Sequence, residues 1–400
     1  MPLEGEGGVA LSTSAVRAPA RGHAVASIDL TALRANFAEV KRLAGGAAVI
    51  AVVKADAYGH GAEPVARTLV DAGCDQLATW SVSEAATLRD AGIQAPILVL
   101  AGAQDAAEAE AAVATRLVPV VHDEGGRERL VGAARRLGGA PAPVHVEIDT
   151  GMRRMGLPAD AAADFLREVH REPALQLAGV MTHFARADEA DLEPTREQWS
   201  RFQAVLGPLA GEVPLGSVHV ANSAGLVSWP DLQLAGPPPD AVRPGLMLYG
   251  AQPCVTRSAT LRPVMSLRAP VVAVRRVRAG DAVGYGARYR APRDTTVATL
   301  GLGYADGLPI SLTNRGAVWL GGGLRPLAGR VSMDSVGVDV GDAPITVGAL
   351  ATVFGVAEPG GPVVAPIETA AAHAETLSYE LLVRVGQRVP RVYAESGASV

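Results

Sequence analysis

A lysine stands at the end of a short apolar run, and its amine could react with a carbonyl group. Residues 47–53 are small or β-branched and show no polar alternation, so they predict a strand buried on both faces that ends at Lys54. Partial desolvation at the end of such a strand lowers a lysine pKa and makes the amine a nucleophile. An isolated lysine at the end of a strand more often points into water. The other residues of the sequence must therefore show whether Lys54 has a chemical role.

Further polar residues follow apolar runs in the same way. They are the segments Asp149–Arg154, His183, Asn222-Ser223 and Arg243–Gly245. In a parallel barrel, side chains just past the strand ends converge on one face, where active sites form. Taken singly, Arg154 could be a solvated charge in a loop, and His183 could be a histidine buried in the core. Together with Lys54 they indicate one site.

Together these residues could bind a phosphorylated aldehyde that forms a covalent bond with the lysine. Ser223 and the backbone N–H groups around Gly245 and Leu246 follow the last two predicted strands, where barrels bind phosphate. A lysine amine can form a Schiff base with an aldehyde, and Arg154 and Arg243 add positive charge. The sequence therefore predicts a site for pyridoxal 5′-phosphate.

Alternating strands and helices must position these residues. We expect strands near residues 49–53, 76–80, 97–100, 117–121, 144–148, 178–182, 217–221 and 240–243, and helices near 62–72, 82–91, 104–114, 125–138, 159–171 and 195–210. Eight strands alternating with helices are typical of a (β/α)8 TIM-type barrel, and a doubly wound sheet is the alternative. We therefore expect an α/β fold with the barrel over residues 23–259.

A second domain is predicted after the barrel. β-type runs at 264–277, 295–300, 317–320, 336–340 and 351–354 are separated by turn-like segments. They predict a mostly β C-terminal domain over residues 260–400, with a short helical piece near 366–384. Residues 24–29 alternate weakly and are a candidate strand of this domain. We expect residues 1–22, rich in Gly, Ala and Ser, to form a disordered tail.

Composition argues against several other classes of protein. A net charge of −5 gives no electrostatic case for nucleic acid or an anionic membrane, and no apolar run reaches the roughly 18 residues of a membrane span. With only Cys74 and Cys254, we expect a cytoplasmic protein without a disulfide scaffold. The histidines and cysteines lack zinc-site spacing, so no metal is expected. Residues 301–307 have the wrong spacing for a dinucleotide loop.

From about residue 24 to the C-terminus, the sequence resembles the alanine racemase family, whose members combine a barrel with pyridoxal phosphate. Residues 51–61 (AVVKADAYGHG) are similar to the cofactor-lysine segment of that family almost letter for letter. Supporting similarities lie at residues 149–152, 154, 182–185, 221–223, 243–245, 248–250, 284–286, 303–307, 329–334, 379–380, 388–391 and 393. The resemblance therefore covers both predicted domains.

The resemblance implies roles for individual residues. Lys54 and Tyr285 would be the catalytic bases on opposite faces of the substrate, with Tyr285 contributed across a dimer interface. The cofactor-binding residues would be Lys54, Tyr58, Arg154, His183, Asn222, Ser223, Arg243, Gly245, Leu246 and Tyr379, and the substrate-binding residues would be Arg154, Tyr304 and Met333. Arg243 would face the pyridine nitrogen, and His183 would pack under the ring and bond to Arg243.

Two positions depart from the pattern of the family. Many relatives carry a lysine two residues before the Asp-Thr-Gly-Met motif, and its carbamylated form orients the arginine. Here that position is Glu147, and we hypothesise that its carboxylate supplies the negative charge that sets Arg154. Ser332 stands beside Met333 where a cysteine is common.

The implied function is a pyridoxal-phosphate-dependent isomerase, a homodimer that interconverts L-alanine and D-alanine by a two-base mechanism for peptidoglycan synthesis. The alternatives are a racemase that also accepts serine or other small amino acids, a decarboxylase or aldolase on a related barrel, and a carrier of the cofactor without turnover. Tyr304 and Tyr379, which narrow the substrate pocket in similar enzymes, favour alanine, and Tyr285 with Met333-Asp334 favours a racemase.

Overall fold

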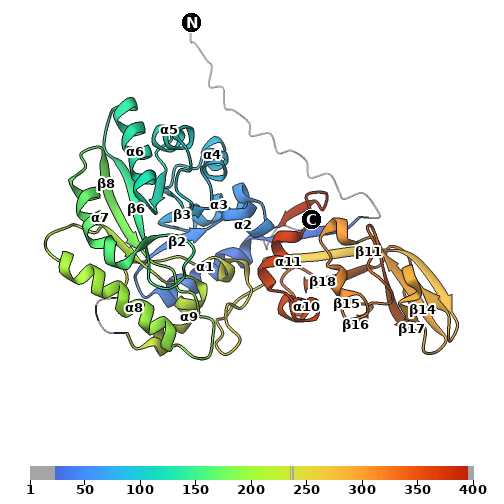
Figure 1. The fold of residues 1–400 in the computed structure, drawn as a ribbon. Helices are drawn as coiled ribbons and strands as arrows, with labels where there is room; N and C mark the ends of the chain where they lie inside the picture. The colour runs from blue at the N-terminus through green and yellow to red at the C-terminus, as the bar shows by residue number, and fades with distance from the viewer. Residues whose placement is uncertain (1–22, 235, 237, 395–400) are drawn as a thin grey trace, which may run out of the picture.

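Two domains make up the part of the chain that the structure describes. The structure is a computed structural model, and it describes residues 23–234, 236 and 238–394. The predicted tail of residues 1–22 lies outside this part. Figure 1 shows the helix-covered barrel on the left and the mostly β domain on the right, with α10 and α11 between them.

Eight parallel strands close into a barrel. They are β2 (Ala48–Val52), β3 (Gln76–Thr79), β4 (Ile97–Val99), β5 (Val118–Val121), β6 (Ala142–Asp149), β8 (Leu175–Met181), β9 (Ser217–His219) and β10 (Ala241–Val242). Neighbouring strands pair in the order β5-β4-β3-β2-β10-β9-β8-β6, and β5 also pairs with β6, which closes the ring. The predicted TIM-type barrel is confirmed, and the doubly wound alternative is wrong.

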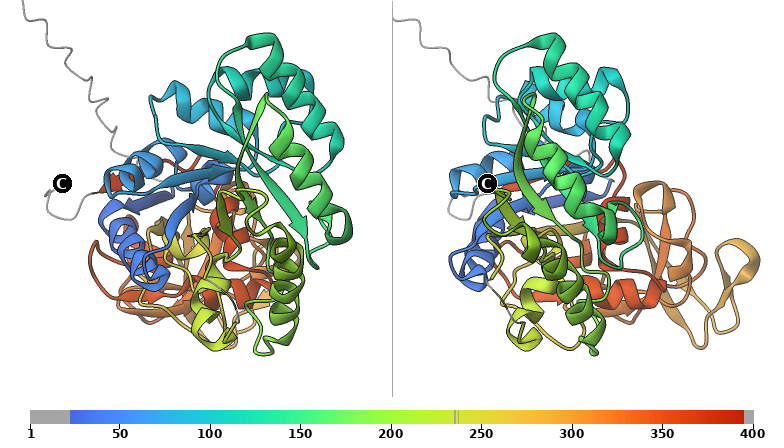
Figure 2. Two further views of the ribbon diagram at one scale, coloured as in Figure 1. Left: turned by 90° about the vertical axis from the view of Figure 1, so that its left-hand side faces the viewer. Right: turned by 60° about the vertical axis from the view of Figure 1, so that its left-hand side comes forward.

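Helices cover the outside of the barrel, as the view from the barrel side in Figure 2 shows. They are α1 (Leu30–Ala44), α3 (Ala62–Asp71), α4 (Val82–Asp90), α5 (Ala106–Ala114), α6 (Glu124–Leu137), α7 (Ala159–Arg171), α8 (Glu193–Leu206) and α9 (Ser223–Leu232). The six predicted helices are present, and α1 and α9 were not predicted. In α1, the Asp29 carboxylate caps the first turn by accepting from the N–H groups of Thr31 and Ala32, both at 2.9 Å.

The C-terminal domain is built on a second sheet of nine strands. They are β1 (Val25–Asp29), β11 (Met265–Val277), β14 (Thr295–Leu300), β15 (Ala317–Leu320), β16 (Gly323–Pro326), β17 (Val336–Gly341), β18 (Leu350–Val356), β19 (Val363–Ala365) and β20 (Arg391–Ala394). Smaller elements are β7 (Leu157–Pro158), β12 (Ala282–Val283), β13 (Tyr289–Arg290), α10 (Ile367–Ala374) and α11 (Ser378–Arg384). The prediction of a mostly β domain with a helical piece near 366–384 is confirmed.

The N-terminal strand belongs to the C-terminal sheet. β1 lies between β11, with which it pairs antiparallel, and β20, with which it pairs parallel. The chain therefore starts in one domain, passes through the barrel and returns to the sheet where it started. Within the described residues, no helix is both long and apolar enough to span a membrane.

Candidate active site

A pocket of about 380 Å³ lies at the C-terminal ends of the barrel strands. Its lining includes all ten residues predicted to bind the cofactor, which are Lys54, Tyr58, Arg154, His183, Asn222, Ser223, Arg243, Gly245, Leu246 and Tyr379. Most come from barrel loops, and Tyr379 comes from α11 of the C-terminal domain. Residues more than 300 positions apart in sequence are thus brought to one cavity, and Glu147 is also in its wall.

Lys54 follows a fully buried strand. Val49 to Val53 are all at most 6% exposed, because β2 is covered on both faces. The Lys54 ammonium lies 5.5 Å from the centre of the Trp80 ring. Burial lowers the pKa of Lys54, the positive charge of Arg154 lowers it further, and Glu84 opposes the shift. An amine with a lowered pKa is more often unprotonated and so more reactive toward a carbonyl.

The backbone after Lys54 forms a left-handed turn, α2 (Lys54–Gly59). Four consecutive residues that are not glycine, Ala55 to Tyr58, have φ between +52° and +54°. The left-handed conformation costs an L-residue roughly 1–2 kcal/mol, so the surrounding contacts must hold this turn in place. The turn carries the Tyr58 ring into the pocket wall, where it stacks on Tyr249 with 4.7 Å between ring centres.

A buried chain of hydrogen bonds lies behind Arg243. Arg243 Nη1 donates to His219 Nδ1 at 2.6 Å, and the His219 Nε2 and His145 Nδ1 atoms are 2.7 Å apart. Because a guanidinium only donates, His219 accepts at Nδ1, carries its proton at Nε2 and donates to His145. Burial and the charge of Arg243 lower the pKa of both histidines, to about 4 for His145. Sequence reasoning missed both, although each interrupts an apolar barrel strand.

Arg243 also contacts the loop after β8. Its Nη2 donates to the carbonyl of Thr182 at 2.7 Å and lies 3.3 Å from His183 Nδ1, the contact expected from the sequence. Burial lowers the pKa of His183 well below its usual value, and the charge of Arg243 adds to this. Burial also lowers the pKa of Arg243 to about 10, so the guanidinium keeps its charge at neutral pH.

The end of the pocket near Ser223 has the features of a phosphate site. Ser223 is the first residue of α9, and helix N-termini attract anions. The N–H groups of Gly245 and Met247 donate to Ser223 Oγ at 3.0 and 3.3 Å. A Cβ on Gly245 would lie 2.3 Å from the Tyr58 hydroxyl, so a larger residue would fill this end. The residues present therefore fit the phosphate of the expected cofactor.

The chain is similar to known proteins over most of its length. The sequence matches the family models described as alanine racemase, N-terminal domain, over residues 28–253, and alanine racemase, C-terminal domain, over residues 264–393. It is 40% identical over 373 residues to the alanine racemase of Aeromonas hydrophila, covering 92% of this chain and 98% of the relative.

Solved structures of alanine racemases are also similar to this chain. The alanine racemase from a D-cycloserine-producing Streptomyces lavendulae superposes with a TM-score of 0.86 at 36% identity, covering 94% of this chain and 98% of that one. The biosynthetic alanine racemase of Pseudomonas aeruginosa gives 0.84 at 35% identity, covering 94% and 100%.

The chain belongs to the alanine racemase family. The resemblance expected from the motifs is confirmed, and so is the enzyme class, because alanine racemases are pyridoxal-phosphate-dependent isomerases. The likeness extends over both domains, so it includes the barrel pocket and the C-terminal residues expected to act with it.

Three predicted residues of this alanine racemase family member lie away from the barrel pocket. Tyr285, Tyr304 and Met333 are in the C-terminal domain and are 71%, 42% and 53% exposed. Tyr285 lines a second pocket of about 350 Å³ beside β14 and β17, and Tyr304 lines a third pocket. A single chain therefore does not bring the two predicted bases, Lys54 and Tyr285, into one cavity.

Glu147 lies beside a histidine that sequence reasoning missed. The Glu147 carboxylate is 6% exposed, and its Oε2 lies 3.1 Å from His122 Nδ1. The other ring nitrogen of His122 lies 2.9 Å from the carbonyl of Leu100, which fixes the ring. Glu147 and Arg154 both line the pocket, and the hypothesis that Glu147 sets Arg154 stays a prediction.

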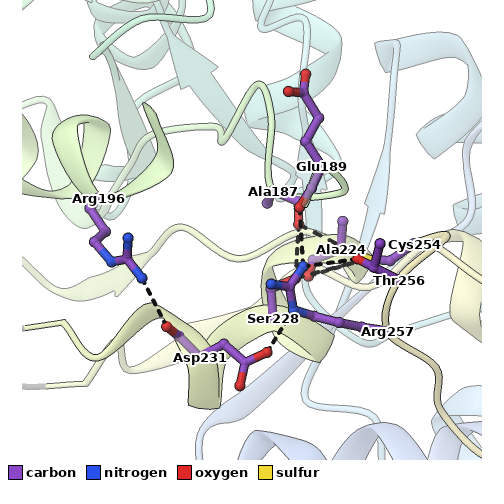
Figure 3. A network of polar contacts seen from close by, with 9 residues as sticks. All are labelled: Ala187, Glu189, Arg196, Ala224, Ser228, Asp231, Cys254, Thr256 and Arg257. Atoms are coloured by element: carbon purple, nitrogen blue, oxygen red, sulfur yellow. Dashed lines mark hydrogen bonds and ion pairs between the residues drawn. The ribbon is translucent and has the colours of Figure 1, made fainter. Parts of the chain in front are cut away.

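A network of polar contacts, drawn in Figure 3, connects the loop after β8 to α9. Arg257 pairs with Asp231 at 2.7 Å and donates to the carbonyl of Glu189 at 3.1 Å. Ser228 Oγ donates to the carbonyl of Ala187 at 2.8 Å. Since this loop contains His183 and α9 begins at Ser223, these bonds connect two segments that line the pocket.

Proposed function

We propose that this protein is an alanine racemase that interconverts L-alanine and D-alanine on pyridoxal 5′-phosphate bound covalently to Lys54. The observation that supports this most is the barrel pocket, whose wall contains every residue expected to contact the cofactor. When bound, the cofactor withdraws electrons from the substrate α-carbon and so acidifies its proton. The protein must hold the cofactor, position the substrate and move that proton.

Lys54 is proposed as the base on one face of the α-carbon. Its lowered pKa leaves more of the amine unprotonated near neutral pH, which suits both bond formation and proton abstraction. Arg243 is proposed to face the pyridine nitrogen. Because the guanidinium donates and keeps its proton, it favours an unprotonated ring nitrogen and so limits electron withdrawal. This restraint would disfavour side reactions such as transamination.

Tyr285 is proposed as the base on the opposite face, supplied by a second copy of the chain. Racemisation needs one group to take the proton and another to return it from the other side. Tyr285, Met333 and Tyr304 are exposed on one chain and lie outside its own barrel pocket. A homodimer in which each C-terminal domain completes the partner's site accounts for both facts.

The substrate is proposed to be alanine, with serine as the competing substrate. Tyr379 narrows the barrel pocket of the same chain, and Tyr304 of a partner subunit would narrow it from the other side. We further propose that the enzyme works in the cytoplasm, where D-alanine would supply peptidoglycan synthesis. The free, buried thiols of Cys74 and Cys254 are consistent with a reducing compartment.

Two substitutions test the proposal. Lys54→Ala removes the amine, so we expect loss of the visible absorption of covalently bound cofactor together with loss of racemisation. Tyr285→Phe removes only a hydroxyl, so we expect normal cofactor absorption and at least a ~100-fold loss of racemisation, the usual scale for a proton-transfer group. Absorption spectra report the cofactor, and α-proton exchange and chirality of alanine and serine in D2O report the reaction.

Bound cofactor without exchange of the α-proton in the wild-type protein would contradict the racemase assignment and favour a carrier. Equal exchange of serine and alanine would favour the broader racemase. Retention of racemisation in Tyr285→Phe would remove this residue from the mechanism.

A further inference from the structure

The left-handed turn α2 is held by contacts from the C-terminal strand of the chain. Arg391 Nε donates to the carbonyl of Gly59 at 3.0 Å, and the Tyr393 hydroxyl donates to the carbonyl of His60 at 3.1 Å. Arg391 and Tyr393 are two positions apart on β20, so they lie on the same face of that strand. The C-terminal domain thus reaches the segment that follows Lys54.

The same guanidinium binds the C-cap residue of α11 and the loop that follows it. Arg391 Nη2 donates to the carbonyl of Val385 at 2.6 Å, and Nη1 donates to the carbonyls of Gly386 and Val389 at 2.6 and 2.8 Å. Together with Gly59, four carbonyls from two separate segments share one side chain. A guanidinium offers five N–H groups in a fixed plane, whereas a lysine ammonium offers three from one point.

Arg391 joins α2 to the residues that follow α11, and each of these two helices carries a tyrosine of the pocket. Tyr58 is in α2 and Tyr379 is in α11, their ring centres are 6.0 Å apart, and both line the pocket. The segments are also in direct contact, because a Cβ on Gly59 would lie 2.5 Å from the carbonyl oxygen of Leu382 in α11. The spacing of the two tyrosines therefore depends on how α2 is held against α11.

We propose that Arg391 is a positioning residue for the cofactor phosphate, which acts by fixing Tyr58 and Tyr379 at the phosphate end of the pocket. The proposal rests on the proposed function, because it takes pyridoxal 5′-phosphate as the ligand. Arg391 does not contact the pocket, so its effect passes through the backbone of α2 and α11. Arg391 contacts α2 at Gly59, which is next to Tyr58 and five residues from Lys54, so the phosphate should be affected more than the aldehyde.

The test compares Arg391→Lys with the wild-type protein in binding pyridoxal 5′-phosphate and pyridoxal, which lacks the phosphate. Dissociation constants come from visible absorption titrations of protein stripped of cofactor. We expect Arg391→Lys to bind pyridoxal 5′-phosphate about tenfold more weakly, the effect of losing two or more hydrogen bonds, and to bind pyridoxal within about twofold of wild type. Arg276→Lys is the matched control, because Arg276 is exposed and pairs with Asp342 at 2.8 Å in the same domain.

A readout without ligand separates positioning from general instability. In the cofactor-free protein, the His60 and Gly61 amides donate within the turn, at 3.1 and 3.0 Å. We expect hydrogen exchange at these amides to accelerate in Arg391→Lys, with the barrel strands unchanged. Tyr393→Phe, which removes one hydroxyl from the same face of β20, should give a smaller loss of phosphate-dependent affinity, about threefold.

The outcomes distinguish the two proposals. Failure of the wild-type protein to bind pyridoxal 5′-phosphate overturns the proposed function, and the role of Arg391 falls with it. Normal binding by wild type with unchanged affinity in Arg391→Lys and Tyr393→Phe overturns only the role of Arg391. An equal loss for both ligands in Arg391→Lys would show that the phosphate is not its target and would also overturn the inference.

Discussion

Glu147 is a single residue that brings a negative charge to the wall of the barrel pocket. Its carboxylate is 3.1 Å from His122 and shares the pocket with Arg154 and the buried Arg243. The charge of Glu147 favours the protonated form of Arg243. A buried carboxylate costs free energy unless opposite charge is near, and the positive charge of Arg243 lies close enough to interact with Glu147.

Glu147→Gln is therefore expected to lower kcat/KM for alanine about tenfold, which corresponds to roughly 1.4 kcal/mol of lost transition-state stabilisation. Glutamine has nearly the same shape, so the change mainly removes the negative charge that we expect to orient Arg154. Racemisation assays with purified variants measure the effect. Glu110→Gln, at an exposed ion pair with Arg136 on the barrel surface, is the control. An unaltered kcat/KM in Glu147→Gln would rule out the charge hypothesis.

At the scale of residues, side chains just past strand ends were predictable and those inside strands were not. Lys54, His183 and Ser223 follow apolar runs, and the geometry of a parallel barrel then requires them to meet. His145 and His219 belong to barrel strands, where a histidine in the sequence does not by itself indicate a functional role. Their contact spans β8, which lies between β6 and β9, and this arrangement exists only in the closed barrel.

At the scale of elements, the left-handed turn α2 had no signature in the sequence. Lys-Ala-Asp-Ala-Tyr contains good right-handed helix formers, so local propensity points away from the observed backbone. The turn forms because contacts from β20 and from Glu84 outweigh that preference. The Ala55 N–H, for example, donates to Glu84 Oε1 at 2.8 Å. Helix α1 differs, because it was not predicted although it has local helix signals in the Asp29 cap and the C-terminal Gly45.

A matched pair of alanine-to-glycine changes tests the strain in α2. Ala55→Gly should raise the free energy of unfolding, by up to about 1 kcal/mol, because glycine adopts positive φ without the Cβ penalty and this gain exceeds its entropic cost. Ala111→Gly, at an exposed site in the right-handed helix α5, should lower it by about 1 kcal/mol. Urea unfolding of the cofactor-free proteins gives both values. Destabilisation of similar size in both variants would argue against strain in the turn.

At the scale of the whole molecule, the residues proposed for catalysis and substrate binding are divided between two surfaces. The barrel pocket holds Lys54, and the exposed β domain holds Tyr285 and Met333. The sequence indicated both sets through their motifs. Composition and periodicity gave no means of telling that one chain keeps them apart, since that depends on how the two domains are oriented.

Mixing two inactive variants tests whether the site is shared. In a dimer of one Lys54→Ala chain and one Tyr285→Phe chain, one site has lost both bases and the other has both intact. Random association makes half of the dimers mixed, so co-expression should restore about a quarter of wild-type activity. Each variant expressed alone is the control. No recovery, with mixed dimers demonstrated by differently tagged chains, would place both bases within one subunit.

The position of β1 has a consequence for the order in which the protein can be completed during synthesis. Ala26 is paired with Arg391, so one edge of β1 stays unpaired until β20 has left the ribosome. The barrel can close earlier, because its strands are consecutive in the chain. The hydrogen bonds of Arg391 to the turn α2 then form last. A nascent chain therefore has its barrel before the proposed cofactor site is complete.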